Sequence, residues 1–281
     1  SKPRNAVPDT LDAEIVRDGA RFFEDGEKMQ LSYAVRNTHR TIGTRSSSHI
    51  VKRFGMRNSL QEDHLTVKLS GSCGQSLGAF AVRGLKLEVY GDANDYVGKG
   101  LSGGMIVVRP QMSSPLDASI NTIIGNTVLY GATGGHLFAS GRAGERFAVR
   151  NSGASVVVEG CGTNGCEYMT GGVAVILGTI GANFGAGMTG GMAYLYDPEG
   201  VAEEFMNLET LVTCAVSNAH WEAQLKGLIQ RHADETGSLK AKAILNDWTA
   251  ERVNFLQACP KEMLVHILHP LSDEREAVPA E

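Results

Sequence analysis

The sequence has 281 residues, including 34 glycines but only 8 prolines, with 42% hydrophobic residues, 6% aromatic residues and a formal net charge of −5. This composition indicates a folded chain with a sizeable core built mainly from Val, Ile, Leu and Ala, and it excludes collagen-like and disordered chains. The sequence has no apolar run of the roughly 18–20 residues that span a membrane and no apolar stretch of a signal peptide at its start. Its slightly acidic balance gives no general case for a nucleic-acid partner.

The composition and the predicted secondary structure change three times along the chain, which predicts four regions. Residues 1–62 form an N-terminal segment of mixed helix and strand, and residues 63–197 form a β core. Residues 198–270 form a C-terminal helical extension. Residues 271–281 form an acidic, apolar-poor tail, for which we expect disorder.

The N-terminal segment contains three predicted elements. Apolar positions within 11–24 predict a helix, and the alternation over 29–35 predicts a strand. Residues 46–54 predict a second helix, which ends at Gly55.

A basic segment overlaps these elements, because residues 28–61 hold seven Lys or Arg and no acidic residue. We expect a solvated or interface-facing surface there. No interleaved row of aromatic residues supports binding of RNA or single-stranded DNA.

In the β core, short β-rich runs alternate with glycine clusters. The runs start about 9–10 or about 18–22 residues apart, a spacing typical of an all-β array. The predicted strands are 65–69, 85–90, 105–108, 127–130, 136–139, 146–149, 155–158, 173–177 and 192–196.

The turns repeat as sequence, since an apolar residue, a hydroxyl residue and two glycines recur at 101–104, 132–135, 169–172 and 188–191. Very short strands at this spacing predict a parallel β-helix, whose coils stack about 4.8 Å apart. Glycine suits stacked corners, where a Cβ would collide or φ is positive. The hydroxyl before each pair is expected to hydrogen-bond along the stack. We predict a structural turn role for Gly98, Gly100, Gly103, Gly104, Gly134, Gly135, Gly171, Gly172, Gly185, Gly187, Gly190 and Gly191.

The C-terminal extension contains three predicted helices. The first has one apolar face over 217–236 and ends at Gly237. Ser238 caps the second, and Thr249 caps a third that runs towards Ala258.

Two fingerprints of enzymes occur in the β core without the structural context that they need. GxGxxG at 98–103 and at 185–190 should open a helix that receives a pyrophosphate, but both copies lead into predicted strands. GxSxG at 74–78 should form a strand-to-helix turn, and no local pattern links its serine to His136 or His220. We therefore assign no catalytic and no cofactor-binding residue.

The cysteines favour neither disulfides nor a metal site. Cys73, Cys161, Cys166, Cys214 and Cys259 are odd in number and form no CxxC pair, which fits reduced thiols in a cytoplasmic protein. Zinc and iron–sulfur sites need a richer ligand set than the spacing of Cys161 and Cys166 offers. We predict buried or turn thiols.

Three arginines and a glutamate surround the predicted strand at 146–149. We favour ion pairs between neighbouring coils, with Glu159 and Glu167 as partners, over an anion-binding site.

Longer motifs carry a resemblance to a known family, over about residues 10–260. They are NTHRTIGT at 37–44, GDANDYVGKGLSGG at 91–104, GNTVLYGAT at 125–133, GERFAVRNSG at 144–153 and EYMTGG at 167–172. In these segments the chain resembles the C-terminal domain of the large (alpha) subunit of glutamate synthase.

The resemblance implies a right-handed parallel β-helix within a larger enzyme, which makes two L-glutamate from L-glutamine, 2-oxoglutarate and a reductant. The parent enzyme carries FMN and an iron–sulfur cluster in other parts. Electrons come from FAD and NADPH on a small (beta) NADPH-oxidising subunit, or from ferredoxin. The domain itself is implied to be a non-catalytic scaffold that holds the amidotransferase and FMN domains, without a cofactor, nucleic acid or membrane partner of its own.

Two alternatives accompany this interpretation. One is a stand-alone β-helix subunit of a split glutamate synthase or of a related oxidoreductase complex; the helices after residue 198 favour the fused large subunit. The other is an independent nucleotide-binding enzyme that uses residues 98–103. The sequence leaves the choice between NADPH and ferredoxin open, and the basic segment 28–61 is expected to dock on the rest of the subunit or on a partner.

Overall fold

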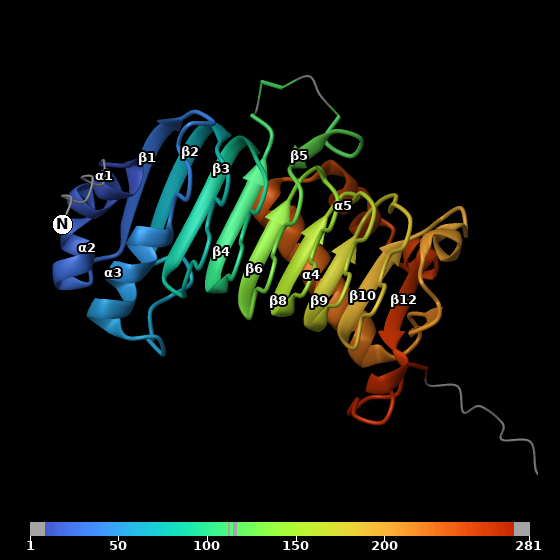
Figure 1. Ribbon diagram of the computed structural model, residues 1–281. Coiled ribbons are helices and arrows are strands. Elements are labelled where there is room, and N and C mark those ends of the chain that lie inside the picture. The colour runs from blue at the N-terminus through green and yellow to red at the C-terminus, as the bar shows by residue number, and fades with distance from the viewer. Residues whose placement is uncertain (1–8, 112, 115–116, 273–281) are drawn as a thin grey trace, which may run out of the picture.

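The structure is a computed structural model that describes residues 9–111, 113–114 and 117–272. Its main element is a 12-stranded mixed sheet in the order β1-β2-β3-β4-β6-β8-β9-β10-β12-β11, with β5 and β7 paired beside this path (Figure 1). The strands are β1 (Met29–Val35), β2 (Leu65–Cys73), β3 (Leu85–Ala93), β4 (Ser102–Arg109), β5 (Thr122–Ile124), β6 (Gly134–Ala139), β7 (Arg142–Ala143), β8 (Ser152–Val158), β9 (Thr170–Ile176), β10 (Gly190–Tyr196), β11 (Leu211–Ala215) and β12 (Phe255–Pro260).

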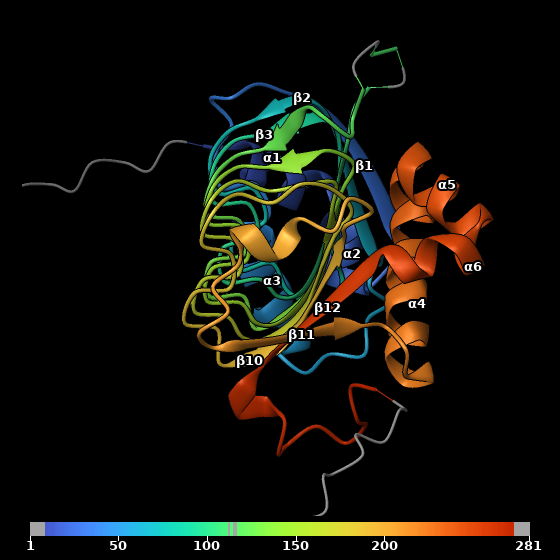
Figure 2. The same ribbon diagram turned by 90° about the vertical axis from the view of Figure 1, so that its right-hand side faces the viewer.

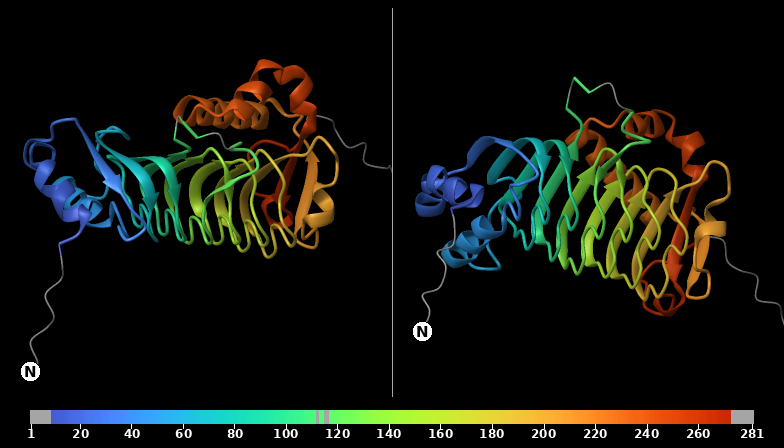
Figure 3. Two further views of the ribbon diagram at one scale, coloured as in Figure 1. Left: turned by 90° about the horizontal axis from the view of Figure 1, so that it is seen from above. Right: turned by 45° about the horizontal axis from the view of Figure 1, so that its top comes forward.

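Helices lie at the start of the chain and after the strand array. They are α1 (Leu11–Asp18), α2 (Ala20–Asp25), α3 (Thr44–Phe54), α4 (Ala219–Thr236), α5 (Leu239–Asn246) and α6 (Trp248–Glu251), with short 3₁₀ turns η1 (Ala202–Phe205), η2 (Arg252–Asn254) and η3 (Lys261–Met263). Figure 3 shows α1–α3 beside β1 at one end of the array and β11 and β12 at the other. None of the helices in the described ranges is long and apolar enough to cross a membrane.

The strands from β1 to β10 on the main path pair in parallel, and the register shifts only near the start of the pairs β4–β6, β8–β9 and β9–β10. Leu65 pairs with Leu85, and Leu87 pairs with Ile106. Because neighbouring strands lie about 4.8 Å apart, residues at matched positions stack into continuous apolar columns. Direction changes only after β10, where β12 pairs antiparallel with β10 and β11 pairs antiparallel with β12.

Two of the predicted strands are wrong. Residues 127–130 and 146–149 are turns, because Thr127, Leu129 and Arg146 have φ of 56–60°, outside the β region. The other seven predicted strands are confirmed, within a few residues at their ends. The incorrectly predicted segments are rich in apolar residues, and consecutive ones are buried, such as Val128 with Leu129 and Phe147 with Ala148, so burial does not alternate as in a half-exposed strand.

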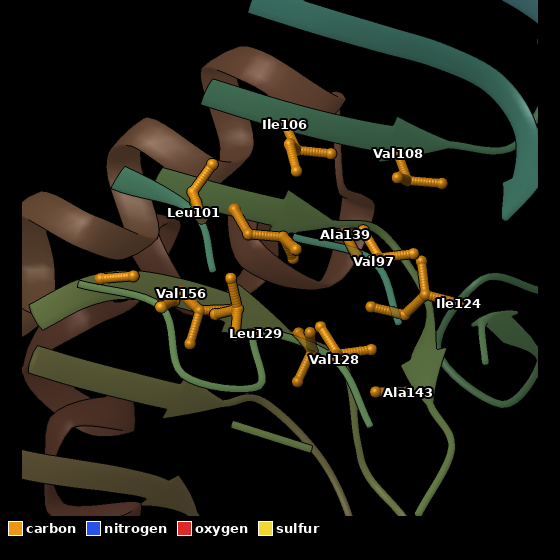
Figure 4. Close-up of a cluster of buried hydrophobic side chains, with 14 of the residues drawn as sticks. Val97, Leu101, Ile106, Val108, Ile124, Val128, Leu129, Ala139, Ala143 and Val156 are labelled. Atoms are coloured by element: carbon orange, nitrogen blue, oxygen red, sulfur yellow. The ribbon is translucent and has the colours of Figure 1, made fainter. Parts of the chain in front are cut away.

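These turns belong to a set of six five-residue segments, which we call the return segments and which lead from one strand of the array towards the next. They are 76–80, 96–100, 127–131, 146–150, 164–168 and 183–187. Strands and return segments enclose the main core, in which Ile106 and Val108 meet Val97 and Leu129 (Figure 4). This core runs the length of the array, as expected for columns of matched residues.

A second core lies on the other face of the strands, under helix α4. Leu225 and Ile229 of α4 pack there with Val107, Phe138 and Tyr194. Figure 2 shows α4–α6 on one side of the strand layer and the return segments on the other. The central strands are therefore buried on both faces, which explains their continuous apolar runs.

Gly237 and Ser238 end α4 and begin α5 as predicted. Gly237 adopts the left-handed conformation with φ of 73°, and Ser238 Oγ accepts a hydrogen bond from the backbone N–H of Ala241. The predicted third helix is wrong beyond α6, because the chain turns into β12. Pairing with β10 places Phe255 and Cys259 in the second core, a tertiary contact that helical periodicity does not reveal.

The N-terminal elements differ from their predictions only in detail. The predicted helix over 11–24 is divided at Gly19 into α1 and α2, and α3 begins two residues earlier than predicted and ends before Gly55. The four-region division of the chain stays a prediction. Residues 273–281 of the predicted tail lie outside the described residues.

Asp12 of α1 caps the N-terminus of α3, although it lies 31 residues before Gly43, the first residue that it bonds. Its carboxylate accepts hydrogen bonds from the backbone N–H of Gly43 at 2.9 Å and of Arg45 at 2.7 Å, and from Ser46 Oγ at 2.9 Å. Asp12 is buried, so water could not take the place of its carboxylate as acceptor for these donors if the side chain were removed. The carboxylate also suits the positive end of the helix dipole.

We expect Asp12→Ala to lower the free energy of unfolding by about 2 kcal/mol, because it removes a cap and leaves buried donors unpaired. Urea unfolding at neutral pH measures this loss. Glu14→Ala, an exposed acidic residue of the same helix, is the control and is expected to change stability by less than about 0.5 kcal/mol. Equal stability of the two variants would contradict the assignment of the cap.

Candidate functional site

The return segments share one backbone conformation. The first, third and fifth residues of each have φ between 52° and 74°, giving eighteen left-handed positions, of which twelve are not glycine. Such a residue costs roughly 1–2 kcal/mol when it carries a side chain. A conformation repeated this often must be stabilised by contacts outside the segment.

Those contacts are hydrogen bonds between successive return segments. Arg150 N–H donates to Glu167 O on the following segment at 2.9 Å, and Ala148 N–H donates to Val128 O on the preceding one at 2.9 Å. In five of the six segments the first and fifth residues donate forwards and the third donates backwards. Each of the four inner segments is thus bonded to both neighbours, which satisfies backbone groups that a lone turn would leave to water.

The paired glycines predicted from the sequence lie where a return segment enters its strand. In most pairs one glycine has positive φ, and the other lies so close to a neighbouring backbone that a Cβ would collide with it. In the pair Gly171 and Gly172, the second has φ of 83°, whereas a Cβ on the first would stand 2.4 Å from Ser152 O. The pair Gly190 and Gly191 is alike, with a Cβ on Gly190 at 2.1 Å from Thr170 O. Gly134 is the exception, because its Cβ would meet nothing closer than 3.9 Å.

The hydroxyl residues before these pairs do not form a regular ladder of side-chain bonds. The Thr133 hydroxyl reaches Leu101 O at only 3.5 Å, a marginal contact. The regular bond is made by the backbone instead, as in Thr133 N–H to Leu101 O at 2.8 Å and Thr189 N–H to Met169 O at 3.0 Å.

Both enzyme fingerprints are part of the return segments. The GxGxxG copies continue directly into β4 and β10, so neither opens a helix that could receive a pyrophosphate. Ser76 of the GxSxG copy is the first residue of a return segment, and its N–H donates to Asp95 O. His136 contacts Glu62 and Phe138, and His220 stacks on His269, so the structure brings neither histidine to Ser76.

The cysteines are free thiols, and four of the five are buried. Burial raises the pKa of Cys161 to about 12, so it is held as the neutral thiol. Within the described ranges no three His, Cys, Asp or Glu side chains converge as metal ligands.

The expected ion pairs between arginines and glutamates of neighbouring coils are not formed. The Arg142 guanidinium donates to Thr179 Oγ1, and the Arg150 guanidinium lies 5.8 Å over the Tyr168 ring. Glu159 is buried and bonds Ser238 instead. None of the ion pairs among the residues that the structure places joins these arginines to Glu159 or Glu167.

Two basic residues of the segment 28–61 have structural contacts. Lys28 forms an ion pair with Asp63 at 2.8 Å, and Arg53 donates to the carbonyl oxygens of Phe23 and Glu24 at the end of α2. All seven basic residues are exposed, and the five without these contacts are Arg36, Arg40, Arg45, Lys52 and Arg57.

A buried polar cluster joins the strand array to the start of α5. Glu159 follows β8, and its Oε1 accepts from Ser238 Oγ at 2.5 Å and from Ser140 Oγ at 3.1 Å, with His232 Nε2 at 3.5 Å. All four side chains are buried. Burial by itself raises the pKa of the Glu159 carboxyl, but the hydrogen bonds from His232 and Ser238 outweigh it and hold that pKa below its ordinary value.

A second polar cluster fixes α4 against the array. Arg231 of α4 bonds Glu62, which also lies 3.3 Å from His136 Nε2, and the Arg231 guanidinium stacks 5.4 Å over the Phe138 ring. Burial and the nearby Arg231 lower the pKa of His136, against the opposing effect of Glu62. His136 is therefore neutral at neutral pH and acts as a hydrogen-bonding partner of Glu62.

Sequence reasoning did not find these two clusters. The available signal was a charge at the end of an apolar run, since Glu159 directly follows three buried valines. Its partners Ser140, His232 and Ser238 lie 19 to 79 residues away. Neither cluster has the geometry of a catalytic triad, because the serines bond the carboxylate rather than the imidazole.

A sequence profile described as "GXGXG motif" matches residues 12–261, the part of the chain that contains the strand array and its return segments. The chain belongs to the GXGXG motif family. It is 63% identical over 268 residues to the glutamate synthase [NADPH] large chain of Azospirillum brasilense, which covers 95% of this chain. It is 51% identical to ferredoxin-dependent glutamate synthase 2 of Synechocystis and 46% identical to glutamate synthase [NADH] of Schizosaccharomyces pombe, over 82% and 95% of this chain. The resemblance to a glutamate synthase large subunit is thus confirmed.

The chain is much shorter than these relatives. The matched segments make up 18%, 15% and 13% of the Azospirillum, Synechocystis and Schizosaccharomyces proteins. The three names also include NADPH, ferredoxin and NADH, so similarity to this segment does not distinguish between electron donors.

Proposed function

We propose that this chain is a structural segment of a glutamate synthase large subunit, which holds the amidotransferase and FMN domains of the parent enzyme in place. Its fold, in this proposal, is a right-handed parallel β-helix flanked by α-helices. The parallel register from β1 to β10 supports this, and so do the return segments, which are bonded each to the next.

The observation that carries the proposal is the continuity of these bonds. Each coil of strand and return segment is hydrogen-bonded to both neighbours along the array, around one unbroken core. Bending such an array would break several backbone bonds at once, so it is stiff along its length. Stiffness over that length is what a spacer between domains requires.

The parent reaction, L-glutamine and 2-oxoglutarate with a reductant to two L-glutamate, belongs in this proposal to other parts of the subunit. The described thiols do not fit an iron–sulfur cluster, which needs three or four converging ligands. FMN and the cluster are proposed to reside elsewhere, with NADPH-linked FAD on a small subunit or ferredoxin as the donor. The free thiols support a cytoplasmic location.

The experiment is done in the full-length large subunit that contains this segment. Gly135→Ala, which strains the array, is expected to lower the fraction of glutamine-derived ammonia that is recovered in glutamate. Glutaminase activity and flavin content should remain. Gly134→Ala is the matched control, because that position has room for a methyl group.

Ser76→Ala and His220→Gln test the absence of chemistry on this segment. Both are expected to leave turnover within about twofold of the parent, since neither contacts reacting atoms in the proposal. Loss of either half-reaction in a folded Ser76→Ala or His220→Gln enzyme would overturn the scaffold assignment.

A further inference from the structure

The return segments form a long face of the array that carries exposed aromatic rings. Phe80 and Tyr168 are 54% and 53% exposed, and Tyr96 and Tyr130 are each 40% exposed. We call these four residues the aromatic face. Figure 2 shows α4–α6 on the opposite side of the strand layer, so the described helices of the C-terminal extension do not cover the return segments.

Three of the four aromatic residues lie on consecutive return segments of the array. Phe80 N–H donates to Lys99 O, three residues beyond Tyr96, and Gly100 N–H donates to Tyr130 O. Tyr168 belongs to segment 164–168, which is bonded to Arg150 of segment 146–150. Segment 164–168 is therefore two segments beyond the one that contains Tyr130. The rings therefore form a row along the face that is interrupted only at segment 146–150, whose Arg150 lies over the Tyr168 ring.

Two of the rings rest on glycines of the following segment. A Cβ on Gly100 would stand 2.5 Å from the Phe80 ring, and a Cβ on Gly187 would stand 2.4 Å from the Tyr168 ring. Both glycines are the fifth residues of their segments and also have positive φ. Because these glycines have no side chain, each ring packs directly on their backbone. A partner would therefore contact side chains that have already lost much of their rotational freedom.

Cations accompany the rings. The Arg150 guanidinium lies 5.8 Å over the Tyr168 ring, and Lys99 Nζ lies 5.9 Å over the Tyr96 ring. Exposed Tyr, Phe and Arg side chains are the composition of interface centres, where they contribute most of the binding energy. Exposed apolar side chains that gather on one face indicate an interaction site, whereas single scattered ones do not.

The length of the relatives indicates what covers this face. The matched segment makes up only 13–18% of them, so more than four-fifths of such a chain lies outside the segment. A contact within one chain also benefits from the high effective concentration of a linked domain.

We propose that the aromatic face is the surface on which another domain of the same large subunit docks, with apolar side chains over the Phe80 and Tyr168 rings and carboxylates beside Lys99 and Arg150. This inference rests on the proposed function, since it assigns the contact surface of the scaffold.

Hydroxyl-radical footprinting of the full-length subunit tests it. Relative to intrinsic reactivity, Phe80, Tyr130 and Tyr168 are expected to be modified at least fivefold more slowly than Leu239, which is 82% exposed. The double variant Phe80→Ser/Tyr168→Ser should speed proteolytic release of the segment about tenfold, which corresponds to about 1.4 kcal/mol of lost contact. Leu239→Ser is the control and should leave release unchanged.

Modification of the four rings as fast as Leu239 would overturn the inference. If the exposed basic residues near α3 were protected instead, the docking surface would be wrong while the scaffold would stand. If no face of the segment were protected, both would fail. Protection that disappeared on dilution of the subunit would assign the face to a second copy and would also overturn the inference.

Discussion

Gly135→Ala is expected to lower the free energy of unfolding by about 3 kcal/mol or more. Gly135 has φ of 95°, which costs an alanine roughly 1–2 kcal/mol, and the new Cβ would stand 2.4 Å from Gly104 O on the coil below. The carbonyl belongs to backbone that is itself bonded to its neighbours, so relief requires the coils to separate. For a domain of this size the loss corresponds to a fall in melting temperature of roughly 6–12 °C.

Gly134→Ala is the matched control, because it changes the adjacent residue of the same pair. Its Cβ would meet only Gly103 N at 3.9 Å, an ordinary contact, and its φ lies outside the left-handed region. We expect a change of less than about 0.5 kcal/mol. Calorimetry of both variants measures the difference, and equal melting temperatures would show that the stacked corners do not require glycine.

Glu159→Ala is expected to lower the free energy of unfolding by about 3–5 kcal/mol, since it leaves a buried imidazole and two hydroxyls without their shared acceptor. Lys240, whose charged form Glu159 favours electrostatically, also loses that attraction. Urea unfolding at pH 7 measures the loss. Glu145→Gln, at an exposed carboxylate, is the control and should change stability by less than about 0.5 kcal/mol.

The same carboxylate predicts a pH dependence. Because the pKa of Glu159 is lower in the folded chain than its ordinary value, its ionised form contributes stability above the unfolded pKa of about 4.3. That contribution is lost as pH falls through the lower folded pKa. Glu159→Gln removes it, so the stability gap between Glu159→Gln and the parent chain should be widest above about pH 5 and narrow towards pH 3. A gap that stayed constant over this range would contradict the assignment.

The strand array could be predicted from the sequence because its signals are local and repeated. Seven of the nine predicted strands form, and the glycine pairs lie where return segments enter strands. The incorrectly predicted strands at 127–130 and 146–149 show the limit of that reasoning. Their apolar composition is typical of a strand, but every second residue has positive φ. Neither Thr127 nor Arg146 is a residue type that usually indicates a left-handed turn.

The aromatic face and the polar clusters depend on contacts between coils and could not be predicted from the sequence. Phe80 reads as part of an apolar run, and only the structure shows its ring exposed on Gly100. Arg150 likewise reads as a partner for Glu167, whereas it lies over Tyr168.

The sequence by itself determined the class of this protein: a β array with glycine corners, reduced thiols and the motifs of the glutamate synthase family. Those features follow from composition and short-range periodicity, which each coil carries within its own residues. The tertiary structure decided which residues stabilise the array and which are exposed on it. Asp12 caps α3, Glu159 accepts a hydrogen bond at the start of α5, and aromatic rings are exposed on the return segments. These contacts join residues that are one coil or many coils apart in the sequence. Whether such residues meet depends on how the coils stack, and a local sequence pattern does not predict this.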